Sequence, residues 1–223
     1  RLLRPKFAIL CGMNTKTVCC ILSAAALACG CATSAPSGAR SIHGFHKHVG
    51  GLDETDFRCR VDKGRFFFSF DVKDEHVSPA TEIKHPLDIA NGDRVEVYFV
   101  PDKDMKTGYR CAEIDCDGRV LSYSVSPVKP DGSKDYDWFW KFKTLKTDAK
   151  RTPQGYRVDG SVEVAELETF GVDATDFHLG VFRADLSKPG KLAAWCSAVE
   201  PKGPPNFHQP AMLFRFTAGK NAD

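Results

Sequence analysis

The sequence lacks the short motifs that mark several common classes of enzyme and metal protein. No G-x-S-x-G, H-E-x-x-H or P-loop pattern occurs in its 223 residues, so nothing indicates a serine hydrolase, a zinc peptidase or a P-loop nucleotidase. No CxxC pair and no His/Cys spacing typical of zinc occurs either. No two carboxylates can be placed from the sequence at the separation that glycoside hydrolysis requires. We therefore expect a non-catalytic protein without a bound metal or other cofactor.

The chain also lacks a strong charge of one sign and a hydrophobic run long enough to cross a membrane. Its formal net charge is +2, of which the first 30 residues contribute +4, which leaves −2 for the rest. A body so close to neutrality has no basic surface for nucleic acid, so no nucleic-acid partner is expected. The most apolar stretch, Val18–Ala28, has 11 residues, whereas a transmembrane helix needs about 20.

This short apolar stretch has the length and the flanks of a bacterial export signal. Met13 is the expected start, and residues 1–12 lie upstream of it. The segment Leu27–Ser34 (LACGCATS) resembles the lipobox of bacterial lipoproteins, in which small residues precede a lipid-modified cysteine. Cys31 and Cys29 compete for that role, with Cys31 favoured, and an ordinary cleaved secretory signal is the alternative. We predict an exported cell-envelope lipoprotein, held at the outer membrane or cell surface by its lipid anchor.

The chain is thus expected to have three parts. Residues 1–31 hold the upstream residues and the lipoprotein signal peptide, 32–50 form a small polar tether, and 51–220 form one folded domain. Within that domain, Cys111 and Cys116 lie an odd number of residues apart on one predicted strand. They therefore face opposite sides and do not easily pair with each other, which leaves a bridge to Cys59 or Cys196 open.

The clearest strand signal is Arg94–Phe99 (RVEVYF), in which apolar and polar side chains alternate. A period of two in a segment rich in valine and aromatic residues predicts a half-buried β-strand. One face would join the core, and the other would carry Arg94, Glu96 and Tyr98. A guanidinium, a carboxylate and a phenol are groups that bind polyols or form a salt-bridge network.

Shorter signals of the same kind recur through the rest of the domain. Strands are expected at Phe57–Val61, Arg65–Val72, Tyr109–Asp115, Arg119–Val125, Asp137–Thr144, Tyr156–Val164, His178–Ala184, Leu192–Ala198 and Met212–Thr217. Asp117 and Gly118 between two of these runs indicate a hairpin, and Ala165–Phe170 is expected to form one short helical turn. About ten strands without a helix of ordinary length predict an all-β fold, an antiparallel, jelly-roll-like β-sandwich.

Several of these stretches together resemble one known family. They are Gly92–Phe99 (GDRVEVYF), Gly108–Arg110 (GYR), Gly155–Asp159 (GYRVD), Leu179–Arg183 (LGVFR), and Trp195 followed by Asn206–Pro210 (NFHQP). Their order and spacing, over about Phe66–Phe216, are similar to those of the family 9 carbohydrate-binding modules and their relatives with a DOMON-like β-sandwich. The resemblance implies a non-catalytic module that holds a mono- or oligosaccharide in a cleft and supports polysaccharide breakdown.

The resemblance also implies site residues. Glu96 matches the acid of the family's D-x-V-E strand, Arg110 a basic position on the next strand, Arg183 the arginine of an N-x-x-R stretch, and Trp195 a late tryptophan. Asp159 stands where the family usually has glutamate. Ala90 or Asn91 stands where the family's sugar-stacking tryptophan precedes the acid strand, so a sandwich of two indole rings is not expected.

The chemistry of these side chains suggests sugar contacts, each with a structural alternative. An aromatic face packs on the C–H surface of a sugar, and planar charged groups bond adjacent hydroxyls in pairs. Bonding of adjacent hydroxyls suits Glu96, with Tyr98 beside it, and Arg110, if their strands are neighbours. The alternative is that Glu96 and Arg110 form an ion pair that only orders the sheet. Trp195 would be a platform for the ligand or part of the core.

Four further candidates could likewise either contact a sugar or have a structural role. Trp138 and Trp140 share one face of a predicted strand, where core packing is favoured over an exposed sugar platform. His208, in a proline-rich loop, would line the rim of the cleft or lie in solvent, and the latter is favoured. Arg183 lies in an apolar strand and needs a partner, for which Asp159 is the candidate.

Two other functions remain as alternatives to saccharide binding. Relatives of the DOMON-like sandwich bind haem, and Met105, Met212, His178 and His208 are conceivable ligands, although no motif pairs them. The second alternative is a module that binds no small ligand and interacts with other components of the cell envelope. The carboxylates of Asp102–Asp104 and Asp115–Asp117 could hold Ca²⁺, but turn chemistry explains both. The sequence indicates neither the sugar nor the oligomeric state.

Overall fold

Twelve strands form most of the chain that the computed structural model describes, residues 39–202 and 206–218. The strands are β1 (Arg40–Lys47), β2 (Leu52–Asp62), β3 (Arg65–Lys73), β4 (Arg94–Val100), β5 (Tyr109–Asp115), β6 (Val120–Val125), β7 (Tyr136–Asp137), β8 (Lys146–Thr152), β9 (Gly155–Glu163), β10 (Asp176–Lys188), β11 (Lys191–Ser197) and β12 (Leu213–Thr217). The helical segments are α1 (Val164–Glu168) and two short 3₁₀ helices, η1 (Pro86–Asn91) and η2 (Pro210–Met212). The expected signal peptide, with Cys29 and Cys31, lies outside the described residues.

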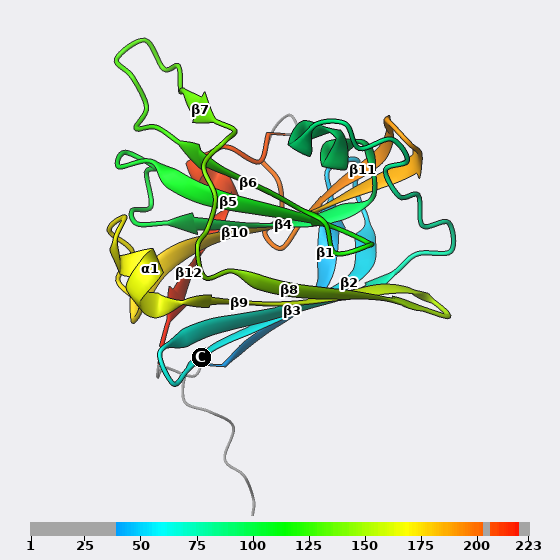
Figure 1. Ribbon diagram of the computed structural model, residues 1–223, viewed down its shortest axis with the longest axis horizontal. Coiled ribbons are helices and arrows are strands. Elements are labelled where there is room, and N and C mark those ends of the chain that lie inside the picture. The colour runs from blue at the N-terminus through cyan, green and yellow to red at the C-terminus, as the bar shows by residue number, and fades with distance from the viewer. Residues whose placement is uncertain (1–38, 203–205, 219–223) are drawn as a thin grey trace, which may run out of the picture. The chain divides into compact units, whose positions relative to one another are not determined.

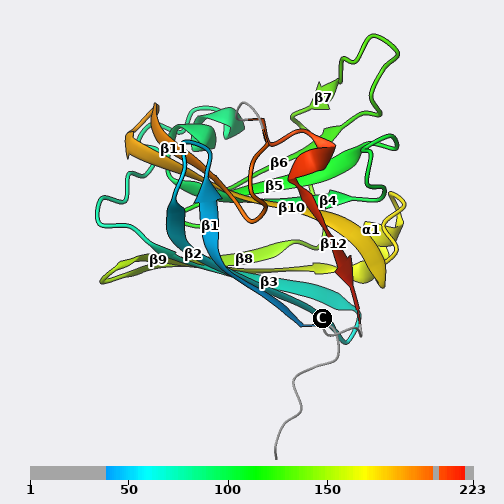
Figure 2. The ribbon, with the colours of Figure 1, turned by 180° about the vertical axis from the view of Figure 1, so that it is seen from behind.

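The strands stack as two layers (Figure 1). The first, called the β4 layer, has the order β7-β6-β5-β4-β10, and both β11 and β12 pair with the far edge of β10. The second, called the β3 layer, has the order β1-β2-β3-β9-β8, and β1 also pairs with β11, which makes the hydrogen-bonded ladder continuous. Seen from behind, β1 and β2 rise from the β3 layer toward β11 (Figure 2). Every pairing between the described strands is antiparallel, so the predicted antiparallel sandwich is confirmed.

The main core lies between the two layers. Phe66, Phe68 and Phe70 of β3 point inward, as their period of two predicts, and each is almost fully buried. The Phe66 ring meets the Phe99 ring of β4 edge-on at 5.5 Å between centroids, so the two layers contact each other through aromatic side chains. Burying each such ring contributes about 1.5–3 kcal/mol.

A second hydrophobic cluster covers the outer face of the β4 layer. It includes Tyr98, Tyr109 and Phe182 from the sheet, with Ile89 of η1 and Phe207 of the segment before η2 packed over them. Strand β4 lies between β5 and β10 and is buried on both faces. The expectation of a half-buried strand is therefore wrong, because loops cover the face that was expected to meet solvent.

Three local expectations differ from the structure. The Asp137–Thr144 segment is not a strand, because Asp137 Oδ1 accepts the backbone N–H groups of Phe139 and Trp140 and turns the chain directly after β7. Edge strand β8 was missed, since its exposed, polar face carries no hydrophobic pattern. Strand β1 lies inside the range expected to be a tether, 32–50.

Among the described residues no helix has both the length and the apolar character needed to cross a membrane.

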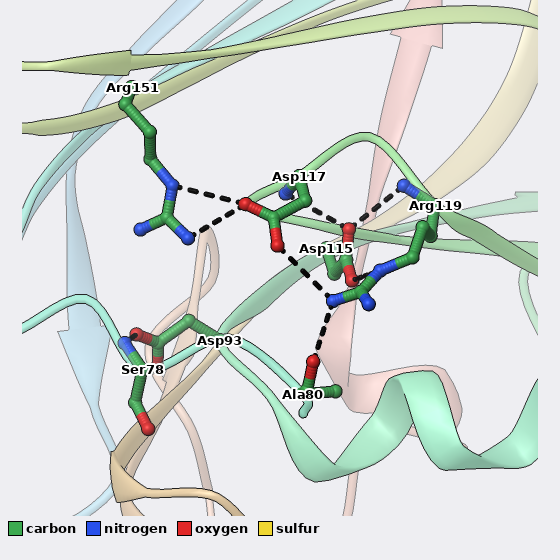
Figure 3. A network of polar contacts seen from close by, with 7 residues as sticks. All are labelled: Ser78, Ala80, Asp93, Asp115, Asp117, Arg119 and Arg151. Carbon is green, nitrogen blue, oxygen red and sulfur yellow. Dashed lines mark hydrogen bonds and ion pairs between the residues drawn. The ribbon is translucent and has the colours of Figure 1, made fainter. Parts of the chain in front are cut away.

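The predicted hairpin is confirmed, with Ile114 of β5 opposite Val120 of β6. Asp115 accepts the backbone N–H groups of Asp117 and Arg119 and pairs with the Arg119 guanidinium at 2.6 Å (Figure 3). Arg151 of β8 reaches across to Asp117 at 2.8 Å, so this turn also links the two layers.

The Asp102 carboxylate also stabilises a turn by accepting backbone N–H groups, as Asp115 does. It accepts the backbone N–H groups of Asp104, Lys106 and Thr107. Both segments that were considered for Ca²⁺ therefore have a direct explanation as turns.

Candidate functional site

A pocket of about 190 Å³ opens on the outer face of the β4 layer. Its lining residues are Arg94, Glu96, Tyr98, Glu113, Trp195, Asn206, Phe207 and His208. Strand β4 supplies three of them at alternate positions, β5 and β11 supply one each, and the segment before η2 supplies the rest. Glu113 stands directly opposite Glu96 in the β4–β5 register, which brings two acidic side chains together on one face.

Three charged groups are enclosed in this pocket. The Arg94 Nε atom donates to Glu113 Oε2 at 2.6 Å and lies 3.0 Å from Glu96 Oε1, and Arg94 Nη1 donates to the carbonyl of Ala90. Glu96 is 1% exposed, and Arg94 and Glu113 are each 6% exposed. Burial, followed by repulsion from Glu113, raises the pKa of Glu96 to about 7.

Hydrogen bonds extend from Glu96 to an imidazole. The Tyr98 hydroxyl donates to Glu96 Oε2 at 2.7 Å, and His208 Nε2 lies 3.4 Å from the same hydroxyl. Since the one proton of Tyr98 goes to Glu96, His208 Nε2 donates to Tyr98, and Nδ1 accepts from the Tyr109 hydroxyl at 2.8 Å. Burial, together with the charge of Lys134, lowers the pKa of His208 to about 4, so the ring is neutral.

The partly buried indole of Trp195 lies at the side of these ionic groups. Its ring meets Phe207 edge-on at 4.5 Å between centroids, and Phe207 stacks on Phe182 at 4.0 Å. The Arg94 guanidinium lies 5.6 Å from the centroid of the Trp195 ring. The pocket therefore combines an aromatic surface with planar charged groups, the two contacts that a saccharide uses.

The structure brings together four of the residues considered from the sequence: Glu96, Tyr98, Trp195 and His208. His208 is half-buried against Tyr98, with ring centroids 5.1 Å apart, so the favoured interpretation of a loop histidine in solvent is wrong.

Arg110 lies on the opposite face of the β4 layer. In the register it stands opposite Phe99 and therefore shares the side of the main core, where its guanidinium lies 5.2 Å from the Trp140 ring and 5.1 Å from the Phe170 ring. The expectation that it lies beside Glu96 is wrong, because side chains alternate along a strand and the register decides which ones share a face.

The other candidates also lie outside the pocket. Trp138 stacks on Tyr136 at 5.1 Å in the tyrosine group around His208, whereas Trp140 packs on Phe142 and Phe170. Arg183 points toward the inter-layer side, and its carboxylate partners are Asp53 and Asp74. Asp159 pairs instead with Arg157, so the expected Arg183–Asp159 pair does not form.

Sequence reasoning missed four lining residues as site candidates: Arg94, Glu113, Asn206 and Phe207. Arg94 was already on the predicted polar face, and Asn206 and Phe207 adjoin His208, so a local signal existed for three of them. Glu113 could be found only from the strand register, which the sequence does not state.

Comparison with known proteins relates the fold of this chain to that of solved structures. No family model and no curated protein sequence matches the chain. Solved structures do match. The chain has the fold of the family 9 carbohydrate-binding modules.

Two of the matching structures are family 9 modules from Caldicellulosiruptor kristjanssonii, in complex with glucose and with cellotriose. They share 15% and 16% sequence identity with this chain, both with a TM-score of 0.50, over 80% and 82% of this chain and 85% of each module. A proposed carbohydrate-binding protein from Bacteroides uniformis matches with a TM-score of 0.54 and 14% identity, over 79% of this chain and 86% of that one. The resemblance seen in the sequence is thus confirmed at the level of fold.

Proposed function

We propose that this chain is a non-catalytic saccharide-binding module and that its ligand occupies the pocket beside Trp195. The observation that carries the proposal is the position of this indole next to the buried group of Arg94, Glu96 and Glu113. Support also comes from the fold, because two structures with the same fold hold glucose and cellotriose. An accessory role in polysaccharide breakdown follows from this proposal.

The chemistry of the pocket suits one sugar ring. The Trp195 face would pack on the ring's C–H surface, and Glu96 and Glu113 would accept hydrogen bonds from adjacent hydroxyls. At about 190 Å³ the pocket is smaller than the sites of about 300–1,000 Å³ that hold drug-sized ligands. With one indole rather than two, binding is expected to be weak and driven by enthalpy.

Isothermal titration calorimetry against a panel of mono- and oligosaccharides tests the proposal. Trp195→Ala should weaken binding at least about tenfold, because it removes the aromatic platform. Trp140→Ala is the matched control, since Trp140 lies on the Arg110 side of the β4 layer, and it should bind as the wild type does. Absence of heat with every sugar, or equal losses in the two variants, would contradict the proposal.

We also propose that the module is exported and anchored by a lipid on Cys31 or, as the alternative, on Cys29. The support is the lipobox-like segment that follows the short apolar run. Expression of the full chain in a bacterial host with a labelled fatty acid should give a labelled, membrane-associated protein. The label should be lost in Cys31→Ser and retained in Cys29→Ser if Cys31 is the modified residue, and no label in the wild type would contradict lipidation.

A haem-binding role is less well supported. Both ring nitrogens of His208 already bond tyrosine hydroxyls, so this candidate ligand would have to leave two partners. An absorption spectrum of the purified protein with a Soret band would favour that role over saccharide binding.

A further inference from the structure

When both of its carboxylates are ionised, the pocket beside Trp195 encloses one more negative charge than positive charge. Glu96 and Glu113 both face a single guanidinium, and Arg94 uses one atom, Nε, for the two carboxylates. Its Nη1 atom is turned away to the carbonyl of Ala90. Each carboxylate is therefore only partly neutralised by protein groups, in a place where water is largely excluded.

The other titratable groups around the pocket do not remove this excess. His208 is neutral, and burial raises the pKa of Tyr98 and of Tyr123 well above the ordinary value, so both phenols keep their protons. Lys134 is the remaining cation nearby. Its Nζ atom donates to the His208 carbonyl at 2.6 Å and to the Tyr109 hydroxyl at 3.4 Å, whereas the ion pairs of Glu96 and Glu113 among the described residues are with Arg94.

One oxygen of the pair has no hydrogen-bond donor among the described residues. Glu96 Oε1 is buried and lies 3.0 Å from Arg94 Nε, but the hydrogen of that nitrogen is directed to Glu113. A buried carboxylate oxygen without a donor is costly. A ligand that brings both a donor and a positive charge would satisfy the oxygen and neutralise the pair.

The walls of the pocket also favour a cation. Trp195, Tyr98 and Phe207 supply aromatic surface around the two carboxylates. Ring faces attract ammonium groups through their quadrupole, most strongly where water is excluded. Paired carboxylates with aromatic neighbours thus recognise an amine better than a hydroxyl.

We propose that this pocket selects an amino sugar, whose protonated amino group lies beside the Glu96 and Glu113 carboxylates and donates to Glu96 Oε1 while Trp195 packs on the sugar ring. The inference rests on the proposed saccharide function and narrows it to a class of ligand. An N-acetylated sugar would not suffice, because its amide carries no charge. A neutral sugar would leave the excess negative charge in place.

Proton release distinguishes the two kinds of ligand. Near neutral pH the carboxyl of Glu96, with a pKa of about 7, is partly protonated. An ammonium group favours the ionised form and expels this proton on binding. The hydroxyls of a neutral sugar bring no charge, so they favour the ionised form of the Glu96 carboxyl less strongly and release less of this proton.

The experiment is calorimetry at about pH 7 with the parent, the 2-amino and the N-acetylamino forms of glucose and of galactose, in two buffers of different ionisation enthalpy. At least one amino sugar should bind about tenfold or more tightly than its parent and its N-acetyl form, with net proton release. Glu113→Gln should reduce this preference about tenfold, because one of the two negative charges is lost. Asp159→Asn, which removes the same charge from the β3 layer, should leave the preference unchanged.

Failure of this inference and failure of the proposed function give different results. If a neutral or N-acetylated sugar binds as tightly as the amino form, the preference for an amine is wrong and saccharide binding stands. If no sugar of any class produces heat, both are wrong. The wild-type comparison decides the question even if Glu113→Gln does not fold.

Discussion

At the scale of single residues, the pocket holds side chains whose protonation is set by burial. The carboxyl of Glu96 keeps its proton to a higher pH than usual and the imidazole of His208 loses its proton at a lower pH than usual. Both shifts favour the neutral form, as expected for groups taken out of water. Neither shift could be read from the sequence, which places Glu96 on a face that looks solvated.

Glu96 should make the stability of the ligand-free protein depend on pH. Its pKa rises from an ordinary value of 4.5 to about 7 on folding, so between these values the folded state binds more protons than the unfolded state. Stability is therefore lost as pH rises through this range. In Glu96→Gln this loss should be absent, so the wild type should lose up to about 1.4 kcal/mol per pH unit relative to the variant.

Urea denaturation at several pH values checks this prediction. Glu82→Gln is the matched control, because Glu82 is a solvent-exposed member of a surface ion pair, and its profile should run parallel to that of the wild type. Parallel profiles for Glu96→Gln as well would contradict a raised pKa at this carboxyl.

At the scale of elements, close strand contacts depend on residues without side chains. Gly160 of β9 stands opposite Phe68 of β3, and a Cβ atom at Gly160 would lie 2.0 Å from the Phe68 ring. The ring packs over the bare backbone of its neighbouring strand. The backbone angle at Gly160 is not in the left-handed region, so the requirement for glycine is one of space.

Gly160→Ala should therefore destabilise the fold by about 1–3 kcal/mol, through overpacking against the Phe68 ring. In a Phe68→Leu background the same substitution should cost clearly less, because the smaller side chain leaves room. A double-mutant cycle by chemical denaturation measures this coupling. Strictly additive losses would show that the Phe68 ring is not what excludes a side chain at this position.

At the scale of the whole domain, a buried ion cluster joins the two layers. Arg183 of β10 is 2% exposed and pairs with Asp53 of β2 at 2.5 Å and with Asp74, just after β3, at 2.7 Å. Arg157 of β9 makes a similar pair of contacts with Asp71 and Asp159, but its side chain is 41% exposed and both partners belong to its own layer. The two arginines thus each contact two carboxylates, but they differ in burial and in whether the pairs cross between the layers.

Arg183→Gln should lower the free energy of unfolding by about 3–5 kcal/mol, because it leaves buried carboxylates without a cation. Arg157→Gln, the matched control, should cost at most about 1 kcal/mol, since water screens its ion pairs. Guanidinium denaturation of both variants provides the comparison. Equal losses would mean that the layers do not depend on the Arg183 cluster.

The sequence by itself indicated most of the strands with a period of two, the Asp117–Gly118 hairpin and the sandwich architecture, and it named four candidates, Glu96, Tyr98, Trp195 and His208, that meet in the pocket. The strands and the hairpin follow from local steric and hydrophobic preferences, which act over a few neighbouring residues, whereas the binding roles of Glu96 and Trp195 came from the resemblance to a known family. Only the tertiary structure decided that Glu113 rather than Arg110 faces Glu96. It also decided that the polar face of β4 is covered and that Arg183 pairs with Asp53. Register, covering loops and ion partners join residues far apart in the chain, and local pattern carries no information about which distant segments pair.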